Sequence, residues 1–246
     1  HETYIKNYHE EVNAIIDNAD KLKKYSIFNK AGSFSYANIL QTARDFERVK
    51  NVILPEDEYK GVQAYTTYYY QYFFTMLVMM FVIYDMFAQR DNGMWSITYS
   101  CANGRIMYAI KQTGVIVVTG AFTHTLIYWS TFIAAMLQRG GVRDLVNPVQ
   151  TIETFDKFTY PWSKIKYVTV LYLISMVCIV ALCITIWGVF VMFRNRVYAL
   201  VTMLIFAAVE QFIYSHIDIH SVWNGLHYIN TVSYTHLRAH ETGRNL

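Results

Sequence analysis

Four long apolar segments follow one another along this chain, separated by polar stretches. A helix that crosses a bilayer needs about 20 mostly apolar residues, and we expect such spans at about residues 66–88, 110–138, 167–193 and 197–217. The third is apolar throughout, from Tyr167 to Phe193, whereas the fourth contains Glu210 and His216. The pattern predicts an all-α, polytopic helical membrane protein with about four transmembrane helices, in a transmembrane domain of residues 61–230.

Residues 1–60 have a different pattern. Their apolar positions recur at intervals of three and four, as in an amphipathic helix that packs on a neighbour rather than spanning a membrane. These positions are Ile5, Tyr8, Val12, Ile15, Ile16, Ala19 and Leu22. Ser33 or Ser35 then offers an N-cap for a second amphipathic helix, and Pro55 ends the region. We therefore expect a separate helical domain at the start of the chain.

The composition fits a membrane protein. Hydrophobic residues make up 54% of the chain and charged residues only 16%, against roughly 25% charged in an average soluble domain. The net charge is +3 and the basic residues are scattered, so nucleic acid is not an expected partner. Cys101, Cys178 and Cys183 lie in or beside apolar stretches and imply no disulfide framework. Lysines and arginines are balanced between the two sets of loops, so charge bias leaves the orientation open.

The loop between the first two predicted spans, at about 89–109, is polar enough to leave the bilayer. Its middle, from Met94 to Cys101, is long enough for a short helix and is bracketed by Gly93 and Gly104. This indicates an interfacial helix between two membrane helices. The sequence contains no phosphate-cradling GxxxxGK(S/T) loop, no GxSxG nucleophile elbow and no Cys-rich zinc framework. We therefore do not expect this chain to hydrolyse ATP by the P-loop route.

The same loop resembles the cytoplasmic loop between the second and third membrane helices of ATP-binding-cassette (ABC) exporter permeases of the type-2 class. In that family an acidic residue and a glycine follow the second helix, a short coupling helix comes next, and an arginine and a lysine open the third. The matching positions are Asp91, Gly93, Met94–Tyr99, Arg105 and Lys111. The sequence differs from the family in having aspartate rather than the commoner glutamate, and Ala102-Asn103-Gly104 where a proline often precedes the arginine.

The resemblance implies a multi-pass permease subunit of an ABC exporter in a bacterial cytoplasmic (plasma) membrane. The chain itself would be no enzyme and would hold no cofactor; separate ABC ATPase subunits would hydrolyse ATP and dock on the loop, with Met94, Trp95 and Ile97 as the contacting side chains. Residues 1–60 would be an extracytoplasmic domain, and the four spans would be helices two to five. A second copy or a related permease would complete the path, whose substrate stays open among lipid, peptide, polysaccharide and drug.

Ionisable residues inside spans are costly and often functional. Glu210 and His124 are therefore candidates for lining a substrate path or for bonding across helices. Glu210 with His216, His220 and His227 also allows a second interpretation, the metal site of an intramembrane metal-dependent hydrolase. The known zinc helix places glutamate directly after its first histidine, where this chain has isoleucine. A structural or regulatory multi-span protein is the third interpretation.

The end of the sequence carries one more candidate for metal chemistry. His236 and His240 are four residues apart and Glu241 follows them. However, the surrounding "VSYTHLRAHET" closely resembles the translation of a sequencing-adapter oligonucleotide, and the chain begins with His1 rather than methionine. We expect a fragment truncated at both ends, in which residues 231–246 are not native and form no metal site.

Overall fold

The computed structural model describes residues 2–25, 33–55, 60–67, 71–93, 95, 97, 100, 104–152, 155 and 158–216. Within these parts of the chain the regular elements are helices, and no strand occurs. The chain divides into two compact units. The first contains His1–Ala64 and Ala135–Thr169, and the second contains Tyr65–Ala134 and the described residues from 170 to 216. The inclusion of Ala135–Thr169 with the N-terminal helices was not anticipated from the sequence.

Among the described residues, three helices are long and apolar enough to cross a membrane, so the prediction of an all-helical membrane protein is confirmed at this level. They are α4 (Gln71–Met86), which continues through α5 (Ala88–Asp91) as an apolar stretch to Arg90, α7 (Gly104–Arg139) and α8 (Lys164–Met192). The fourth predicted span corresponds to α9 (Arg196–His216), whose apolar part, Arg196–Val209, is shorter. Large apolar side chains are exposed on α7 at Val118 and Phe122, as expected of a surface that faces lipid rather than water.

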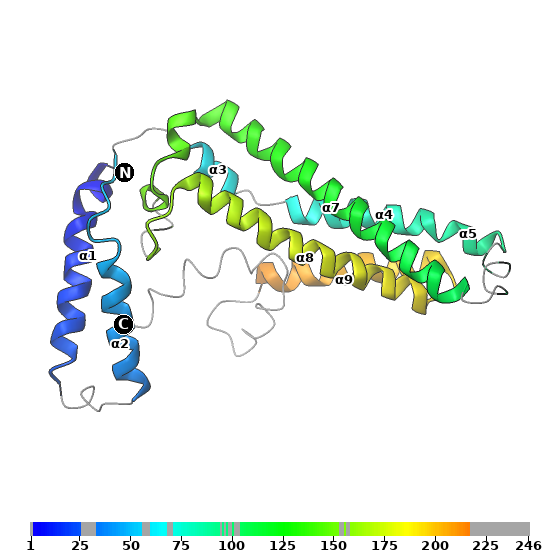
Figure 1. Cartoon of the computed structure of the whole chain (residues 1–246), viewed down its shortest axis with the longest axis horizontal. Coiled ribbons are helices and arrows are strands. Elements are labelled where there is room, and N and C mark those ends of the chain that lie inside the picture. The colour runs from blue at the N-terminus through cyan, green and yellow to red at the C-terminus, as the bar shows by residue number, and fades with distance from the viewer. Residues whose placement is uncertain are drawn as a thin grey trace. The chain divides into compact units, whose positions relative to one another are not determined.

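The first unit contains the helical pair that the N-terminal pattern predicts. Helices α1 (Glu2–Leu22) and α2 (Phe34–Glu47) lie side by side (Figure 1). Their shared core contains Phe46 together with Tyr8 and Val12, which come from the predicted apolar stripe. Ser33 rather than Ser35 is the N-cap, because its hydroxyl accepts a hydrogen bond from the Tyr36 N–H at 3.2 Å. This satisfies one of the N–H groups that the first turn of a helix leaves free.

The first unit also holds a folded segment between α7 and α8. Two short 3₁₀ helices, η1 (Val142–Leu145) and η2 (Val149–Thr151), form most of its regular structure. The Lys60 N–H donates to the Arg139 carbonyl at 3.1 Å, directly before α3 (Gly61–Thr67). Gly61 and Gly140 then approach so closely that a Cβ atom on Gly61 would lie 2.8 Å from the Gly140 Cα. Only glycine fits such a contact between two backbones.

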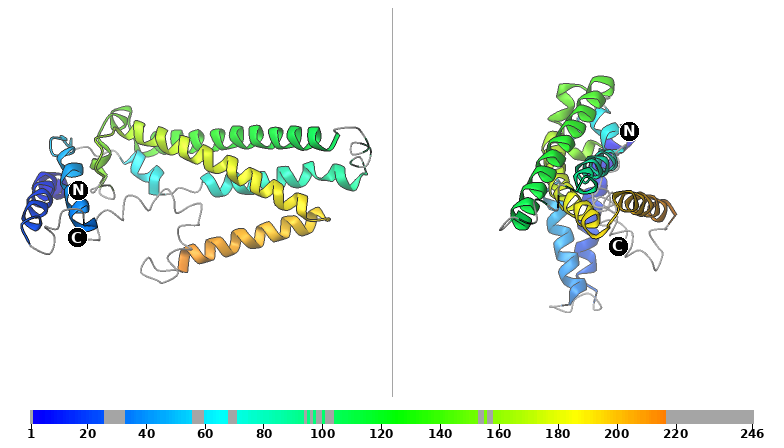
Figure 2. Two further views of the ribbon diagram at one scale, coloured as in Figure 1. Left: turned by 60° about the horizontal axis from the view of Figure 1, so that its bottom comes forward. Right: turned by 90° about the vertical axis from the view of Figure 1, so that its right-hand side faces the viewer.

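The second unit is built on α4, α7 and α8, which lie side by side in both Figure 1 and Figure 2. A Cβ atom on Gly120 would lie 2.5 Å from the Cys183 Sγ and 3.4 Å from the Met79 Cε, so this glycine sets the close approach of the three helices. Small residues commonly serve this purpose between membrane helices. Helix α9 packs against α4, where the Arg196 guanidinium lies 4.6 Å from the centre of the Tyr84 ring.

Candidate functional site

The loop after α4 turns at Gly93, one of the residues predicted for ATPase coupling. Its φ is +71°, in the left-handed region, and its N–H donates to the Arg90 carbonyl at 3.2 Å. Glycine is favoured in this conformation directly after a helix because it has no Cβ atom to clash. Asp91, also a predicted coupling residue, is the last residue of α5. The local sequence therefore specifies a sharp end to the helical stretch that begins with α4.

Trp95 anchors this loop to the neighbouring helices. The half-buried indole ring lies 5.5 Å from the Phe87 ring and 5.7 Å from the Tyr108 ring, measured between centroids. Its N–H donates to the Tyr108 hydroxyl at 3.2 Å. Phe87 follows α4 and Tyr108 lies in the second turn of α7, so one side chain joins the loop to both spans that flank it.

Arg90 extends this anchor to a third helix. Its guanidinium lies 5.2 Å from the centre of the Phe87 ring and 5.4 Å from that of Trp95. Its Nη1 donates to the Phe190 carbonyl at 3.3 Å. Phe190 is in the last turn of α8, where carbonyl groups lack helical partners and carry partial negative charge. Sequence reasoning missed this role because the acceptor is a backbone atom 100 residues away along the chain.

The other predicted coupling residues differ in their surroundings. Ile97 is 71% exposed. Arg105 and Lys111 lie in the first turns of α7 with exposed side chains, whereas Met94 lies outside the described residues. The structure thus brings Trp95 together with the helix ends and leaves Ile97 on the surface of the loop.

His124, one of the two predicted path-lining residues, is fully buried between α4, α7 and α8. Its Nδ1 lies 3.2 Å from the Thr75 hydroxyl and its Nε2 lies 2.8 Å from the Ser175 hydroxyl. The rings of Tyr128 and Tyr172 lie beside it, with the Tyr172 ring parallel to the imidazole. His124 therefore bonds across helices in the interior of the second unit. Glu210, the other predicted residue, belongs to α9, and its side chain is not among those that the structure describes.

The metal-site hypothesis falls mostly outside the described residues. His216 is the last residue of α9. The other two histidines of that hypothesis, at positions 220 and 227, follow the described part of the chain, as do the tail residues at 236, 240 and 241, which are not expected to form a metal site. Within the residues that the structure describes, no group of three or more histidine, cysteine, aspartate or glutamate side chains is placed to hold a metal ion.

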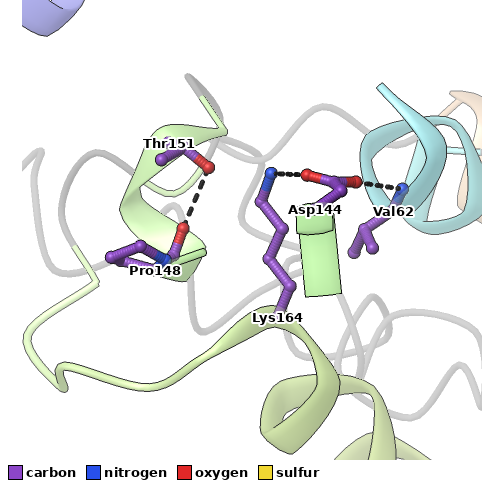
Figure 3. Close-up of polar contacts among 5 residues, drawn as sticks. All are labelled: Val62, Asp144, Pro148, Thr151 and Lys164. Atoms are coloured by element: carbon purple, nitrogen blue, oxygen red, sulfur yellow. Dashed lines mark hydrogen bonds and ion pairs between the residues drawn. The ribbon is translucent and has the colours of Figure 1, made fainter. Parts of the chain in front are cut away.

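A buried ion pair lies in the first unit, and sequence reasoning did not find it. Asp144 in η1 is fully buried and pairs with Lys164, which is 3% exposed and opens α8 (Figure 3). The second carboxylate oxygen of Asp144 lies 3.5 Å from the Val62 N–H (Figure 3). Buried charges are retained where they are paired, because an unpaired one loses its hydration without compensation. The two residues are 20 positions apart and no periodic pattern links them.

The segment between these two charges is held by further hydrogen bonds. The Val149 N–H donates to the Trp162 carbonyl at 2.9 Å, and the Lys164 N–H donates to the Asn147 carbonyl at 2.9 Å. The buried Gln150 amide donates to the carbonyls of Phe158 at 2.9 Å and Tyr160 at 2.7 Å. The ion pair therefore closes a loop whose backbone is already held together by hydrogen bonds.

Comparisons with protein-family models, with curated proteins and with solved structures found no match for this chain.

Proposed function

We propose that this chain is the membrane permease subunit of an ABC exporter, which moves its substrate with ATP hydrolysed by separate ATPase subunits. The proposal is supported by three apolar helices of spanning length and by the match of Asp91, Gly93 and Arg105 to the coupling loop of that family. A second copy of the chain, or a related permease, completes the path in a bacterial cytoplasmic membrane.

The observation that carries the proposal is the anchoring of the loop between α4 and α7. Motion of an ATPase reaches the membrane only through an element that is rigidly joined to the spans. Trp95 joins the loop to Phe87 and to Tyr108 on α7, and Arg90 joins it to the Phe190 carbonyl on α8. A push on this loop is therefore transmitted to three helices rather than absorbed by a flexible connection.

Ile97 is the described side chain best suited to dock a partner from this loop. It is 71% exposed, and it lies two residues from the half-buried anchor Trp95. An apolar side chain on a fixed base can fill a pocket of an ATPase with little loss of conformational entropy. The expected contact is of the helix-in-groove kind, in which a few apolar anchors carry most of the binding energy.

The test replaces Ile97 by aspartate and measures co-purification with the ATPase encoded next to this gene. Loss of an apolar anchor costs at least about 2 kcal/mol, which is roughly a thirtyfold loss of affinity. Ile53→Asp is the matched control, because Ile53 is 82% exposed in the first unit and has no proposed role. Ile97→Asp should abolish co-purification while Ile53→Asp preserves it. Equal recovery with both variants rules out the coupling assignment, and a gene neighbourhood without any P-loop protein counts against the exporter.

A further inference from the structure

The buried contacts of His124 form a continuous chain across three helices. The Thr75 hydroxyl lies 2.8 Å from the Gln71 carbonyl in its own helix and 3.2 Å from the His124 Nδ1. The Ser175 hydroxyl lies 2.8 Å from the Tyr172 carbonyl in its own helix and 2.8 Å from the His124 Nε2. Each of these four contacts needs one hydrogen atom between its two heavy atoms.

The hydrogen atoms available do not suffice for all four contacts. Thr75 and Ser175 supply one hydroxyl hydrogen each, and a neutral imidazole supplies one more. Three hydrogens thus serve four contacts when His124 is neutral, and one contact is left unmade. A doubly protonated imidazole donates from both ring nitrogens, so each hydroxyl can donate to its carbonyl. The hydrogen that completes the fourth contact is therefore one proton taken up by His124.

A second observation on the same helix points in the same direction. Gln71, one turn before Thr75, is 3% exposed, and its side-chain oxygen is buried with no hydrogen-bond partner among the described residues. Buried acceptors are nearly always satisfied in folded proteins. This part of α4 therefore offers more acceptors than the described donors can serve.

Among the described residues, the groups around His124 are aromatic rings rather than fixed charges. The titratable groups that face it are the phenols of Tyr128 on α7, 5.7 Å away, and Tyr172 on α8, 6.4 Å away, both measured between ring centroids. The Cys183 thiol on α8 lies one turn further along, against Gly120. On α4 the group in contact with His124 is the uncharged Thr75 hydroxyl. No acidic side chain among the described residues forms an ion pair with His124.

Two effects act on a proton at this position. Burial opposes the charged imidazole, because the cation loses its hydration. Against this, both N–H groups of the cation find hydroxyl acceptors, and such charge-assisted bonds are stronger than neutral ones. Because hydroxyl groups both donate and accept, the heavy atoms need not move between the two protonation states.

We propose that His124, Thr75 and Ser175 form a proton-binding site between α4, α7 and α8. The proton occupies the imidazole and completes the hydrogen-bond chain from the Gln71 carbonyl to the Tyr172 carbonyl. Because the three residues come from three helices, proton uptake strengthens the contacts that join those helices. This site does not depend on the exporter proposal, since it is defined by the interior of one chain and needs no ATPase.

The test observes the imidazole directly. The chain has eight histidines, so replacing all except His124 by glutamine leaves one histidine to label with nitrogen-15. Nuclear magnetic resonance of this chain in lipid nanodiscs distinguishes a neutral ring, with one protonated nitrogen, from a charged ring, with two. We expect a reversible change from the first to the second as the pH falls from about pH 8 to about pH 3, a range extended below the ordinary one of histidine because burial opposes the charged ring. A ring that keeps one unprotonated nitrogen throughout overturns the proposal.

Two variants in the same background test the part played by the hydroxyl groups. Thr75→Val and Ser175→Ala each remove one acceptor of the charged ring, so each should abolish the titration or move its midpoint by about one pH unit or more. Thr185→Val is the matched control, because that hydroxyl is exposed and donates to the Ala181 carbonyl of its own helix. A titration that neither variant changes overturns the assignment of the site to these three residues. If a variant fails to fold, the titration of the unaltered site decides.

Discussion

Removing one partner of the buried Asp144–Lys164 pair should open the segment between α7 and α8. Lys164→Met keeps the length of the side chain and removes its charge. The carboxylate of Asp144 then stays fully buried and retains only the Val62 N–H, at 3.5 Å, as a described donor. Since burial excludes water from both groups, the lost partner cannot be replaced by solvent without opening the segment.

The expected cost follows from the burial of both charges. Asp144 is 0% exposed and Lys164 is 3% exposed, so solvent screens the pair little. Removing one member of such a pair typically costs about 3–5 kcal/mol, because a buried charge is left uncompensated. Each 1.4 kcal/mol is a factor of ten in an equilibrium constant. The segment should therefore open at least about a hundredfold more often.

Hydrogen exchange followed by mass spectrometry measures this opening in lipid nanodiscs. The amides of Val149 and Lys164 report on it, because they bond the carbonyls of Trp162 and Asn147 across the segment. Lys166→Met is the control: its exposed ammonium lies 5.0 Å from the centre of the Trp162 ring, a contact worth about 0.5–1 kcal/mol. Exchange that rises less than about fivefold in Lys164→Met, or equally in both variants, would refute the reasoning.

The double variant separates the charge from the packing. Asp144→Val combined with Lys164→Met removes both charges and leaves apolar groups in the buried site. Replacing a whole buried pair by apolar residues is often neutral, so the double variant should recover most of the protection that the single variant loses. A double variant as unprotected as Lys164→Met would show that volume, rather than the unpaired charge, controls the segment.

Three further substitutions test two close glycine contacts and the hydrogen bonds of Gln150. Gly61→Ala brings a Cβ atom to 2.8 Å from the Gly140 Cα and should lower the free energy of unfolding by about 1–3 kcal/mol. Gly114→Ala is the control, because a Cβ atom there meets nothing within 4 Å and should not lower the thermal midpoint. Equal midpoints for the two variants would contradict this reasoning. Gly120→Ala places a Cβ atom 2.5 Å from the Cys183 Sγ and should lower the midpoint in detergent, and Cys183→Ala in the same chain should restore it. Gln150→Leu removes two donors to loop carbonyls and should speed amide exchange there, at a cost of about 1–3 kcal/mol; unchanged exchange would contradict the role of the amide.

Local patterns in the sequence predict the helices well. The N-terminal stripe places Tyr8 and Val12 in the core that they form, since residues three and four apart share a helix face. Hydropathy predicts the three long apolar helices because the bilayer imposes length and composition on a span. It also places a fourth span where α9 lies, although the apolar part of α9 is shorter.

The contacts that define the candidate sites follow no such rule. His124 reaches Thr75 at a separation of 49 residues and Ser175 at 51, and Arg90 reaches the Phe190 carbonyl at 100. The sequence marks His124 as unusual because an ionisable side chain lies within an apolar segment, but it does not identify the partners. Trp95 is likewise marked by its place in the loop, while its burial against Phe87 and Tyr108 depends on how α4 and α7 meet.

The sequence by itself determined that this chain is helical, that it contains apolar segments of membrane-spanning length, and where the polar loop between α4 and α7 lies. Those properties depend on the spacing of apolar side chains and on the free energy of moving them from water into the bilayer. Both are set by residues that are close together in the sequence. Only the tertiary structure decided which polar groups satisfy one another: Asp144 with Lys164, and His124 with two hydroxyl groups. Buried polar groups bond whichever partners the packing of the helices brings close to them. The positions of such partners follow no regular spacing in the sequence.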